Sequence, residues 1–368
     1  MIISKPLTAM NQLMFLIPLL SLLIILLILP MIRAVALKVN LTDIPNGRKV
    51  HRQPVPLVGG IAVFVAVSLA LTFAMFHGFH LGEYVSIYLG ATVLLIMGVA
   101  DDKWDLGASL KLLIQLTLAH YIYLQGFYID TLLGVFGIYA IPHWLEYALT
   151  IVVVAGVVNA FNLMDGIDGL AASIAIFTLA MLGAFAYMLN LLNIMLICMS
   201  IMGALVGFLY YNFSKTRKIF MGDAGSLVLG FVMVVLAIAL LQKAEQAARP
   251  DIMYGGVFAV MALPVLDALR VFKNRIRRGK SPFAADKTHL HHLFLVTGLK
   301  HKYITLLIAA LLVFITLMGV LTSSLTGVTF GVQIVLLVFS LTTRILKTKS
   351  DIQHWQVKIR EMEQQGNL

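Results

Sequence analysis

Long apolar segments alternate with short polar turns along most of the 368-residue chain. A helix needs about 20 mostly apolar residues to cross the hydrocarbon core of a bilayer, and these segments are close to that length. The pattern predicts an all-α, polytopic integral membrane protein with about eleven transmembrane helices. The predicted helices cover residues 13–33, 57–76, 85–100, 109–125, 146–161, 170–188, 191–211, 225–243, 253–272, 302–321 and 328–345.

The segment 127–142 is apolar but is not predicted to span the membrane. It is interrupted by Asp130, Gly134, Gly137 and Pro142, and its short alternation of apolar and polar residues is typical of a β-hairpin. Counting it as a span would also move every later basic loop to the opposite side of the membrane. We therefore predict a short external hairpin here.

The distribution of basic residues predicts the orientation. With an odd number of spans, only Lys5, Lys243 and Arg249 of the 27 lysines and arginines lie on the N-terminal side. Basic residues favour the cytoplasmic side of a membrane, so the N-terminus is expected outside and the C-terminus in the cytoplasm. The basic residues behind the net charge of +10 are distributed as membrane sidedness requires, so this charge gives no reason to expect a nucleic-acid partner.

Composition supports the membrane assignment. Hydrophobic residues make up 60% of the chain and charged residues 12%, whereas soluble domains are about half apolar and about a quarter charged. The single Cys198 lies in an apolar segment, so it forms no intrachain disulfide. We expect a transmembrane domain over 1–345 and a polar cytoplasmic tail over 346–368, where apolar residues at helical spacing predict an amphipathic surface helix.

Acidic residues recur at the predicted helix ends. Asp101 and Asp102 follow the third segment, while Asn162, Asp165 and Asp168 follow the fifth. Carboxylates at the end of a hydrophobic span are costly unless they hold a cation or a substrate, and adjacent carboxylates repel each other. Helix capping is the simpler alternative, but the recurrence of such clusters favours a shared site.

The turn before the eighth segment combines an acid with glycines. Asp223 stands directly before the segment, with Gly222 and Gly225 on either side. A helix N-terminus with free N–H groups suits phosphate oxygens, and a carboxylate at that point can share a magnesium ion with them. An N-cap role for Asp223 is the alternative.

The longest inner loop contains a histidine cluster, His289, His291 and His292, among many basic residues. Zinc usually requires cysteine or a carboxylate at ligand spacing as well, so imidazoles that donate hydrogen bonds to a diphosphate are the better match. Asp267, inside the ninth segment, has no obvious partner in sequence, and a substrate role and a structural role are equally open for it.

On the predicted topology, these groups all meet at the cytoplasmic face. A transporter more often buries its charges near the midplane of the bilayer, so a transporter or flippase is the less favoured alternative. Carboxylates beside cationic loops predict a magnesium-dependent enzyme that acts on a phosphate compound, with manganese as a substitute ion. One substrate is expected to be water-soluble and polyphosphorylated, and the other a lipid phosphate.

Four motifs resemble those of the polyprenyl-phosphate N-acetylhexosamine-1-phosphate transferases (glycosyltransferase family 4), the membrane superfamily that includes the enzymes initiating peptidoglycan and O-antigen synthesis. The loop with the histidine cluster resembles that of the branch that uses UDP-N-acetylglucosamine. In the muramoyl-pentapeptide branch three histidines are consecutive, whereas Leu290 interrupts them here. The motifs are Asp101-Asp102-Lys-Trp-Asp105, Asn162-Leu-Met-Asp165-Gly-Ile-Asp168-Gly-Leu, Phe220-Met-Gly-Asp223-Ala-Gly-Ser226 and His289-Leu-His291-His292.

The resemblance implies a reaction and a location. Undecaprenyl phosphate would attack the β-phosphate of UDP-N-acetylglucosamine and give undecaprenyl-diphospho-N-acetylglucosamine and UMP, the first membrane step of a cell-envelope polysaccharide pathway. Another UDP-N-acetylhexosamine, or UDP-N-acetylmuramoyl-pentapeptide, is the alternative donor. The enzyme would lie in the bacterial plasma membrane with its site facing the cytoplasm. A homodimer is common in the family, but no residue in this sequence defines an interface.

The resemblance also implies a role for individual residues. Direct displacement is favoured over an aspartyl intermediate, because a phosphate monoester is already anionic near pH 7. The implied roles are catalysis for Asp101, Asp102, Asp165, Asp168 and His291; magnesium binding for Asp223 with Asn162; nucleotide binding for Asn212, Phe220 and Asp168; and diphosphate or sugar binding for His289, His291 and His292.

Overall fold

The computed structural model describes residues 4–43, 54–279, 281, 288–296 and 298–366. Within these ranges every predicted hydrophobic segment is helical, which confirms an all-α membrane protein. Nine of the described helices are long and apolar enough to cross a membrane, and α2 and α4 are shorter apolar helices; the number of spans and their orientation stay predictions. The helices are α1 (Ser4–Lys38), α2 (Gly59–Met75), α3 (Val85–Trp104), α4 (Ala108–Leu124), α5 (His143–Asn162), α6 (Leu170–Met188), α7 (Leu192–Asn212), α8 (Gly222–Lys243), α9 (Pro250–Arg277), α10 (Leu290–Leu295), α11 (His301–Thr326) and α12 (Val328–Gly366).

Two short β-hairpins accompany the helices. β1 (Thr42–Asp43) pairs antiparallel with β2 (Val55–Pro56) before α2. β3 (Thr131–Val135) pairs antiparallel with β4 (Ile138–Ala140) between α4 and α5, which confirms the predicted hairpin. The second hairpin contacts the start of α12, because Phe136 N donates a hydrogen bond to the Thr329 hydroxyl at 2.9 Å.

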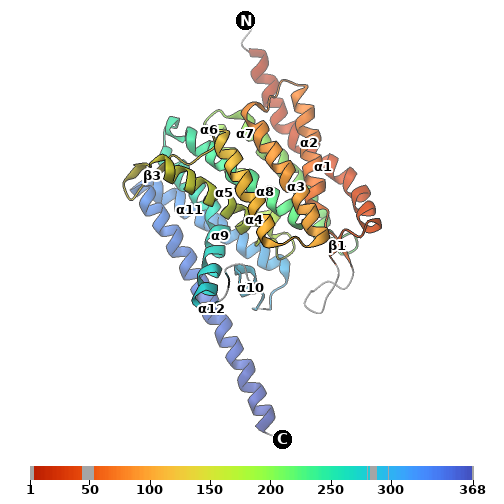
Figure 1. Cartoon of the computed structure of the whole chain (residues 1–368), viewed down its shortest axis with the longest axis vertical. Helices are drawn as coiled ribbons and strands as arrows, with labels where there is room; N and C mark the ends of the chain where they lie inside the picture. The colour runs from red at the N-terminus through yellow and green to blue at the C-terminus, as the bar shows by residue number, and fades with distance from the viewer. Residues whose placement is uncertain (1–3, 44–53, 280, 282–287, 297, 367–368) are drawn as a thin grey trace.

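α8 lies at the centre of the helix bundle (Figure 1). It is the most enclosed candidate span, with 89% of its apolar window buried, and it packs against α2, α3, α5, α6 and α9. A helix that is apolar on all sides is stable only when its neighbours cover it. The rest of the bundle is therefore arranged around this helix.

Glycines allow α2 and α3 to reach the first turn of α8. A Cβ atom on Gly60 would lie 2.2 Å from the backbone N of Gly225, and one on Gly98 would lie 2.3 Å from Cα of Ala224. Small residues let membrane helices pack backbone to backbone. Because Asp223 belongs to the same turn of α8, these contacts fix the position of a predicted site residue.

The chain before α2 pairs with the chain before α8. Leu57 and Phe220 form a parallel β-bridge. Phe220 N donates to Pro56 O at 2.9 Å, and Gly59 N donates to Phe220 O at 2.9 Å. These bonds hold the backbone of Phe220 next to the start of α8, so the place of its ring is set by the fold.

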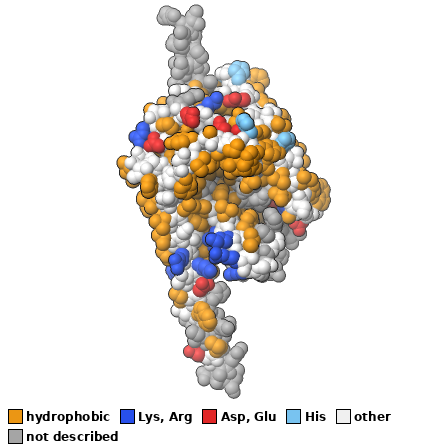
Figure 2. All heavy atoms as spheres, turned by 60° about the vertical axis from the view of Figure 1, so that its left-hand side comes forward, with side chains coloured by type: hydrophobic (Ala, Val, Ile, Leu, Met, Phe, Trp, Pro, Cys, Tyr) orange, Lys and Arg blue, Asp and Glu red, His pale blue; other side chains and the backbone are white. Residues whose placement is uncertain are grey.

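The surface matches a membrane protein, and the predicted polar tail is helical in the structure. Hydrophobic side chains cover the middle of the molecule, while lysines and arginines gather where α12 leaves the body (Figure 2). α12 runs without a break from Val328 to Gly366, so the tail continues the last apolar helix and extends away from the body (Figure 1). Its apolar residues Ile352, Trp355 and Met362 are exposed.

Gly98→Ala should lower the melting temperature of the purified protein in detergent, because the added methyl group has no room beside Ala224. Overpacking of this kind costs about 1–3 kcal/mol. Gly156 of α5 is the matched control, since a Cβ atom there would meet nothing within 4 Å. Gly156→Ala should leave the melting temperature unchanged or raise it, because alanine favours a helix over glycine by roughly 1 kcal/mol. Equal shifts in the two variants would contradict this packing.

Candidate functional site

A cavity of about 900 Å³, the site cavity, lies where α3 and α7 end and where α4, α8 and α11 begin. Most of the residues that line it are charged or polar. Three other predicted site residues, Asn162, His289 and His291, lie outside the lining. The predicted site residues that line it are Asp101, Asp102, Asp165, Asp168, Asn212, Phe220, Asp223 and His292.

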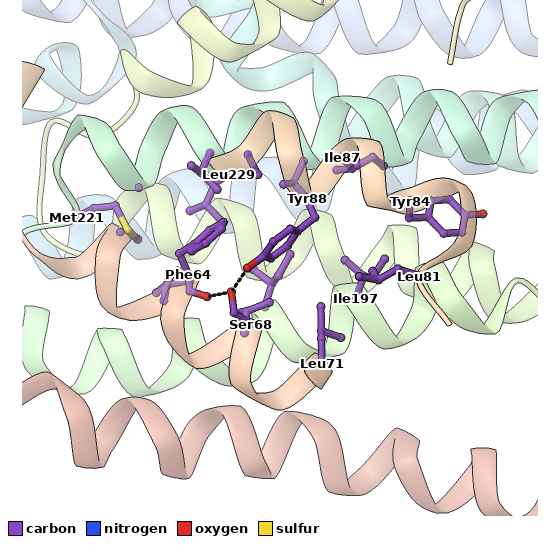
Figure 3. Close-up of a pocket in the computed structure, with 18 residues that line it drawn as sticks. Phe64, Ser68, Leu71, Leu81, Tyr84, Ile87, Tyr88, Ile197, Met221 and Leu229 are labelled. Atoms are coloured by element: carbon purple, nitrogen blue, oxygen red, sulfur yellow. Dashed lines mark hydrogen bonds between the residues drawn. The ribbon is translucent and has the colours of Figure 1, made fainter. Parts of the chain in front are cut away.

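A second, apolar pocket of about 60 Å³ lies among α2, α3, α7 and α8 (Figure 3). No charged side chain of the described chain lines it. Two of its hydroxyl groups are hydrogen-bonded, since Tyr88 donates to Ser68 Oγ at 3.1 Å and Ser68 donates to Phe64 O at 2.7 Å. The charged groups needed for phosphate chemistry are therefore in the site cavity.

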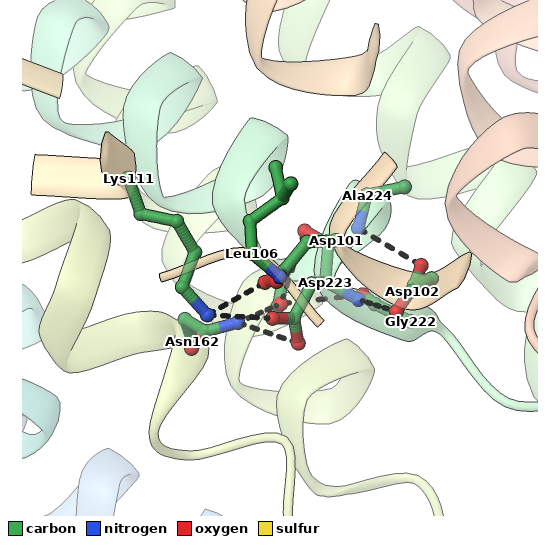
Figure 4. Close-up of polar contacts among 9 residues, drawn as sticks. Asp101, Asp102, Leu106, Lys111, Asn162, Gly222, Asp223 and Ala224 are labelled. Atoms are coloured by element: carbon green, nitrogen blue, oxygen red, sulfur yellow. Dashed lines mark hydrogen bonds and ion pairs between the residues drawn. The ribbon is translucent and has the colours of Figure 1, made fainter. Parts of the chain in front are cut away.

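Asp102 caps the N-terminus of α8. Its carboxylate accepts hydrogen bonds from Asp223 N at 2.9 Å and from Ala224 N at 3.3 Å (Figure 4). Gly222 makes room for it, because Gly222 has φ +75° and a Cβ atom there would lie 2.4 Å from Asp102 Oδ2. These two N–H groups are thus already bonded and are not free for a phosphate, contrary to the sequence-based expectation.

Asp101 and Asp223 face each other beside a lysine (Figure 4). Lys111 Nζ lies 2.7 Å from Asp101 Oδ2 and 3.9 Å from Asp223 Oδ2. The two carboxylates are within hydrogen-bonding reach of each other. Like charges this close require a shared proton or a cation between them. The Asp101 side chain is 3% exposed and the Asp223 side chain 37% exposed, so Asp223 is the more accessible ligand.

Asn162 orients the Asp223 carboxylate. Its Nδ2 donates to Asp223 Oδ1 at 3.0 Å and to Ser226 Oγ at 2.9 Å. The end of α5 is thereby joined to the start of α8. Asn162 is next to the predicted metal ligand, as expected.

Asp165 and Asp168 differ in environment, although they are three residues apart. Burial, and then the charges of Asp102 and Asp168, raise the pKa of Asp165 to about 7. Its carboxyl makes no hydrogen bond within the described part of the chain. Burial also favours the neutral form of Asp168, but hydrogen bonds from His301 and Lys218 hold the pKa of Asp168 below its usual range. Of these two acids, Asp168 is therefore ionised near neutral pH, whereas Asp165 can exchange a proton there.

Asn212 and Phe220 line the cavity together. The Asn212 amide nitrogen donates to Ile219 O at 2.8 Å, and its Oδ1 is buried without a partner among the described residues. Lys218 Nζ lies 2.6 Å from Asp168 Oδ2 and 5.3 Å from the centre of the Phe220 ring. One wall of the cavity therefore carries an aromatic ring and an ammonium group, together with a buried amide oxygen that has no partner among the described residues.

The three predicted histidines are not equivalent. His292 lines the site cavity, whereas His289 and His291 are 4% and 3% exposed. His291 packs on the turn that carries Asp165, because a Cβ atom on Gly166 would lie 2.3 Å from His291 Nε2. Burial, and then a neighbouring His292, lower the pKa of His291 to about 3, so this ring is neutral near pH 7. Of these three rings, that of His292 lines the cavity, and direct substrate contact by His289 and His291 stays a prediction.

Sequence reasoning missed three basic side chains that line the cavity, Lys111, Lys218 and His301. Lys111 was detectable as a lone charge in an apolar helix. Lys218 belongs to a run of basic residues that resembles a topology signal, and His301 stands at the head of a span. Only the packing brings these three to the acids, with Lys218 and His301 contacting the same carboxylate, that of Asp168.

Known proteins with similar sequences have related names. The sequence model of glycosyl transferase family 4 matches residues 84–241. The chain is 31% identical over 297 residues, 78% of its length, to the "Probable undecaprenyl-phosphate N-acetylglucosaminyl 1-phosphate transferase" of Bacillus subtilis (strain 168), and covers 79% of that protein. It is 29% identical to the "Undecaprenyl-phosphate alpha-N-acetylglucosaminyl 1-phosphate transferase" of Yersinia pestis, with 83% of each chain covered, and to that of Escherichia coli (strain K12), with 78% of each covered. The chain therefore belongs to glycosyl transferase family 4, the polyprenyl-phosphate N-acetylhexosamine-1-phosphate transferase superfamily that its four motifs indicated.

Proposed function

We propose that the protein transfers N-acetylglucosamine 1-phosphate from UDP-N-acetylglucosamine to undecaprenyl phosphate and releases UMP. The observation that carries this proposal is the meeting of all four motifs at one cavity, represented by Asp102, Asp168, Asp223 and His292. Similarity at 29–31% identity to proteins named for this transfer supports the choice of substrates.

The site cavity, in this proposal, faces the cytoplasm from a bacterial plasma membrane. Lys103, Lys111 and Lys218 line the cavity, and further lysines and arginines gather where α12 leaves the body (Figure 2). Basic residues favour the cytoplasmic side. A water-soluble nucleotide sugar would enter from that side, while the lipid acceptor would approach from the bilayer.

The nucleotide would bind at the wall formed by Asn212 and Phe220. The Phe220 ring offers an apolar face for stacking. The unpartnered Oδ1 of Asn212 matches the N3–H donor of uracil, because a buried acceptor gains most when its missing hydrogen bond is supplied. Asp168, held by Lys218 at 2.6 Å, lies at the same end of the cavity and would contact the nucleotide.

Magnesium is the ion that suits the acidic centre, the group formed by Asp101, Asp102 and Asp223 at the start of α8. Asp223 would hold it, with Asn162 orienting the carboxylate and Asp101 facing it. No group of three or more metal-ligating side chains is gathered at one point in the described chain, but magnesium is usually held by one or two carboxylates together with substrate phosphates and water. Bound there, the ion would neutralise negative charge on the donor diphosphate.

The transfer exchanges one phosphorus–oxygen bond for another. An oxygen of undecaprenyl phosphate bonds to the β-phosphorus of the donor, and the bond from that phosphorus to the UMP oxygen breaks. The acceptor is already anionic near pH 7, so direct displacement needs little base. Asp165, with a pKa of about 7, can accept the remaining acceptor proton. Lys111 and Lys218 would balance phosphate charge, and His292 would donate a hydrogen bond to the diphosphate.

Purified protein with magnesium, undecaprenyl phosphate and UDP-N-acetylglucosamine labelled in the sugar and the β-phosphate should give a lipid-soluble product that carries both labels, with UMP released. Unlabelled UDP-sugars added in competition would identify the donor, since another UDP-N-acetylhexosamine is the second candidate. Uptake of the label into liposomes without chemical conversion would favour a transporter and overturn the proposal.

Removal of divalent ions with a chelator should abolish transfer, and added magnesium should restore it. Asp223→Asn should lower kcat by roughly 100-fold or more, as expected when a group that stabilises transition-state charge is lost. Asp251→Asn is the matched control, because Asp251 pairs with Arg249 at 2.9 Å at the opposite end of the bundle from the site cavity. Full activity of Asp223→Asn would remove this residue from the metal site.

Asp165 and Asp168 should affect the pH dependence of stability with opposite signs. The folded-state pKa of Asp165 is raised from 3.8 to about 7, so its charge destabilises the fold increasingly as pH rises through that range. Asp165→Asn should therefore raise the melting temperature at pH 8, and by less at pH 5, in buffer with chelator. The pKa of Asp168 is lowered, so its charge stabilises the fold above pH 4, and Asp168→Asn should lower the melting temperature at pH 8. Melting-temperature differences that do not vary with pH would be at odds with these environments.

A further inference from the structure

Asp267 is a completely buried acid on α9 that no step of the proposed transfer uses. Its carboxylate has three donors. Arg270 Nη2 lies 2.7 Å from Oδ1, His289 Nδ1 lies 2.9 Å from Oδ2, and Leu290 N lies 3.0 Å from Oδ1. A buried carboxylate is stable only when it is paired and hydrogen-bonded in this way.

Two of the three donors belong to the start of α10. Leu290 is the first residue of α10, so the carboxylate caps that helix, whose first N–H groups have no partner within the helix. Arg270 holds Thr288, just before His289, as well, because its Nη2 donates to Thr288 O at 2.6 Å. An acid that served only to neutralise Arg270 would have no need to reach α10. Asp267 and Arg270 together fasten residues 288–290 to α9.

The fastened segment carries the histidine cluster. The rings of His289 and His291 are nearly parallel, with centres 6.1 Å apart, and the rings of His291 and His292 are 4.2 Å apart. His291 packs on Gly166 in the turn of Asp165, and His292 lines the site cavity. A shift at the start of α10 would therefore move His292 in the cavity.

We propose that Asp267 is a positioning residue, whose carboxylate holds the ring of His289 and the N-terminus of α10 and thereby places His292 in the site cavity. Because Nδ1 of His289 must carry the hydrogen in this bond, Asp267 also determines that this nitrogen of the ring is the donor. This inference rests on the proposed function in one respect, namely that His292 contacts the donor substrate.

Steady-state kinetics separate positioning from a general loss of folding. Asp267→Asn keeps an acceptor for Leu290 N but loses the charge that holds His289 and Arg270. It should raise KM for UDP-N-acetylglucosamine by about 10-fold or more, the size expected when a partner that orients a site residue is removed. KM for undecaprenyl phosphate should stay at the wild-type value, and Asp251→Asn, on the same helix, should change neither. A merely structural role would lower the active fraction and leave both KM values unchanged, and that result would overturn the proposal.

Two further variants test the route through α10. Asp267→Asn should add little to the donor KM of His292→Ala, because both changes remove the same contact and their effects are then not additive. His289→Asn, whose amide nitrogen can take the place of Nδ1, should raise the donor KM less than His289→Leu. Full additivity of the first pair would contradict the coupling between Asp267 and His292.

A labelling experiment tests the same contact without catalysis. Leu295 of α10 lines the site cavity, and the native Cys198 is fully buried. In a Leu295→Cys protein, a water-soluble maleimide should react faster after Asp267→Asn than before it, because α10 is released from α9. Equal labelling rates would count against the proposal. If the wild-type protein transfers no sugar phosphate, the proposed function fails, and this measurement still decides whether Asp267 holds α10.

Discussion

The backbone contact between α3 and the first turn of α8 is the constraint on which the site depends. At Gly98 a single methyl group would overlap with Ala224, and at Gly222 it would overlap with the Asp102 carboxylate. The absence of these side chains lets Asp102 reach the N-terminus of α8. The acids of two separate motifs, Asp102 and Asp223, are joined by this contact. Close helix packing and the acidic centre are consequently one feature of the molecule.

Segment length and polarity were enough to predict the long helices, because the need for about 20 apolar residues per span is a local property of the sequence. The hairpin at 131–140 was predictable for a similar reason, since Gly134 and Gly137 break the apolar run. The partners of individual side chains were not predictable. Neither the bond from Lys111 to Asp101 nor the cap that Asp102 provides depends on nearby sequence, because both come from packing between helices.

The histidine motif illustrates the same limit. From the sequence alone its three histidines look equivalent, and their basic neighbours favoured a common role in phosphate binding. Tertiary packing separates them, because Asp267 and Gly166 bury His289 and His291 and leave His292 at the cavity. The motif spacing predicted the location of the cluster, whereas the different environments depend on α9 and on the α5–α6 turn.

Charge in the site cavity is unevenly balanced. Seven aspartates line it, against three lysines and two histidines (Asp43, Asp101, Asp102, Asp105, Asp165, Asp168 and Asp223; Lys103, Lys111 and Lys218; His292 and His301). An anionic donor and an anionic acceptor would be repelled by such a field unless cations accompany them. The pKa of Asp165 is raised and that of Asp168 is lowered, so the excess negative charge is not spread evenly over the cavity. Pairs of acids with separated pKa values are typical of sites where one group stays charged and the other exchanges protons.

The unbroken course of α12 has a practical consequence. Beyond Ser350, the last of its residues known to be buried, the helix continues to Gly366, a further length of about 24 Å at 1.5 Å per residue. A reporter protein joined to this end would stand on a stalk at that distance from the body. A fusion at this end of α12 would therefore keep the reporter away from the helix bundle.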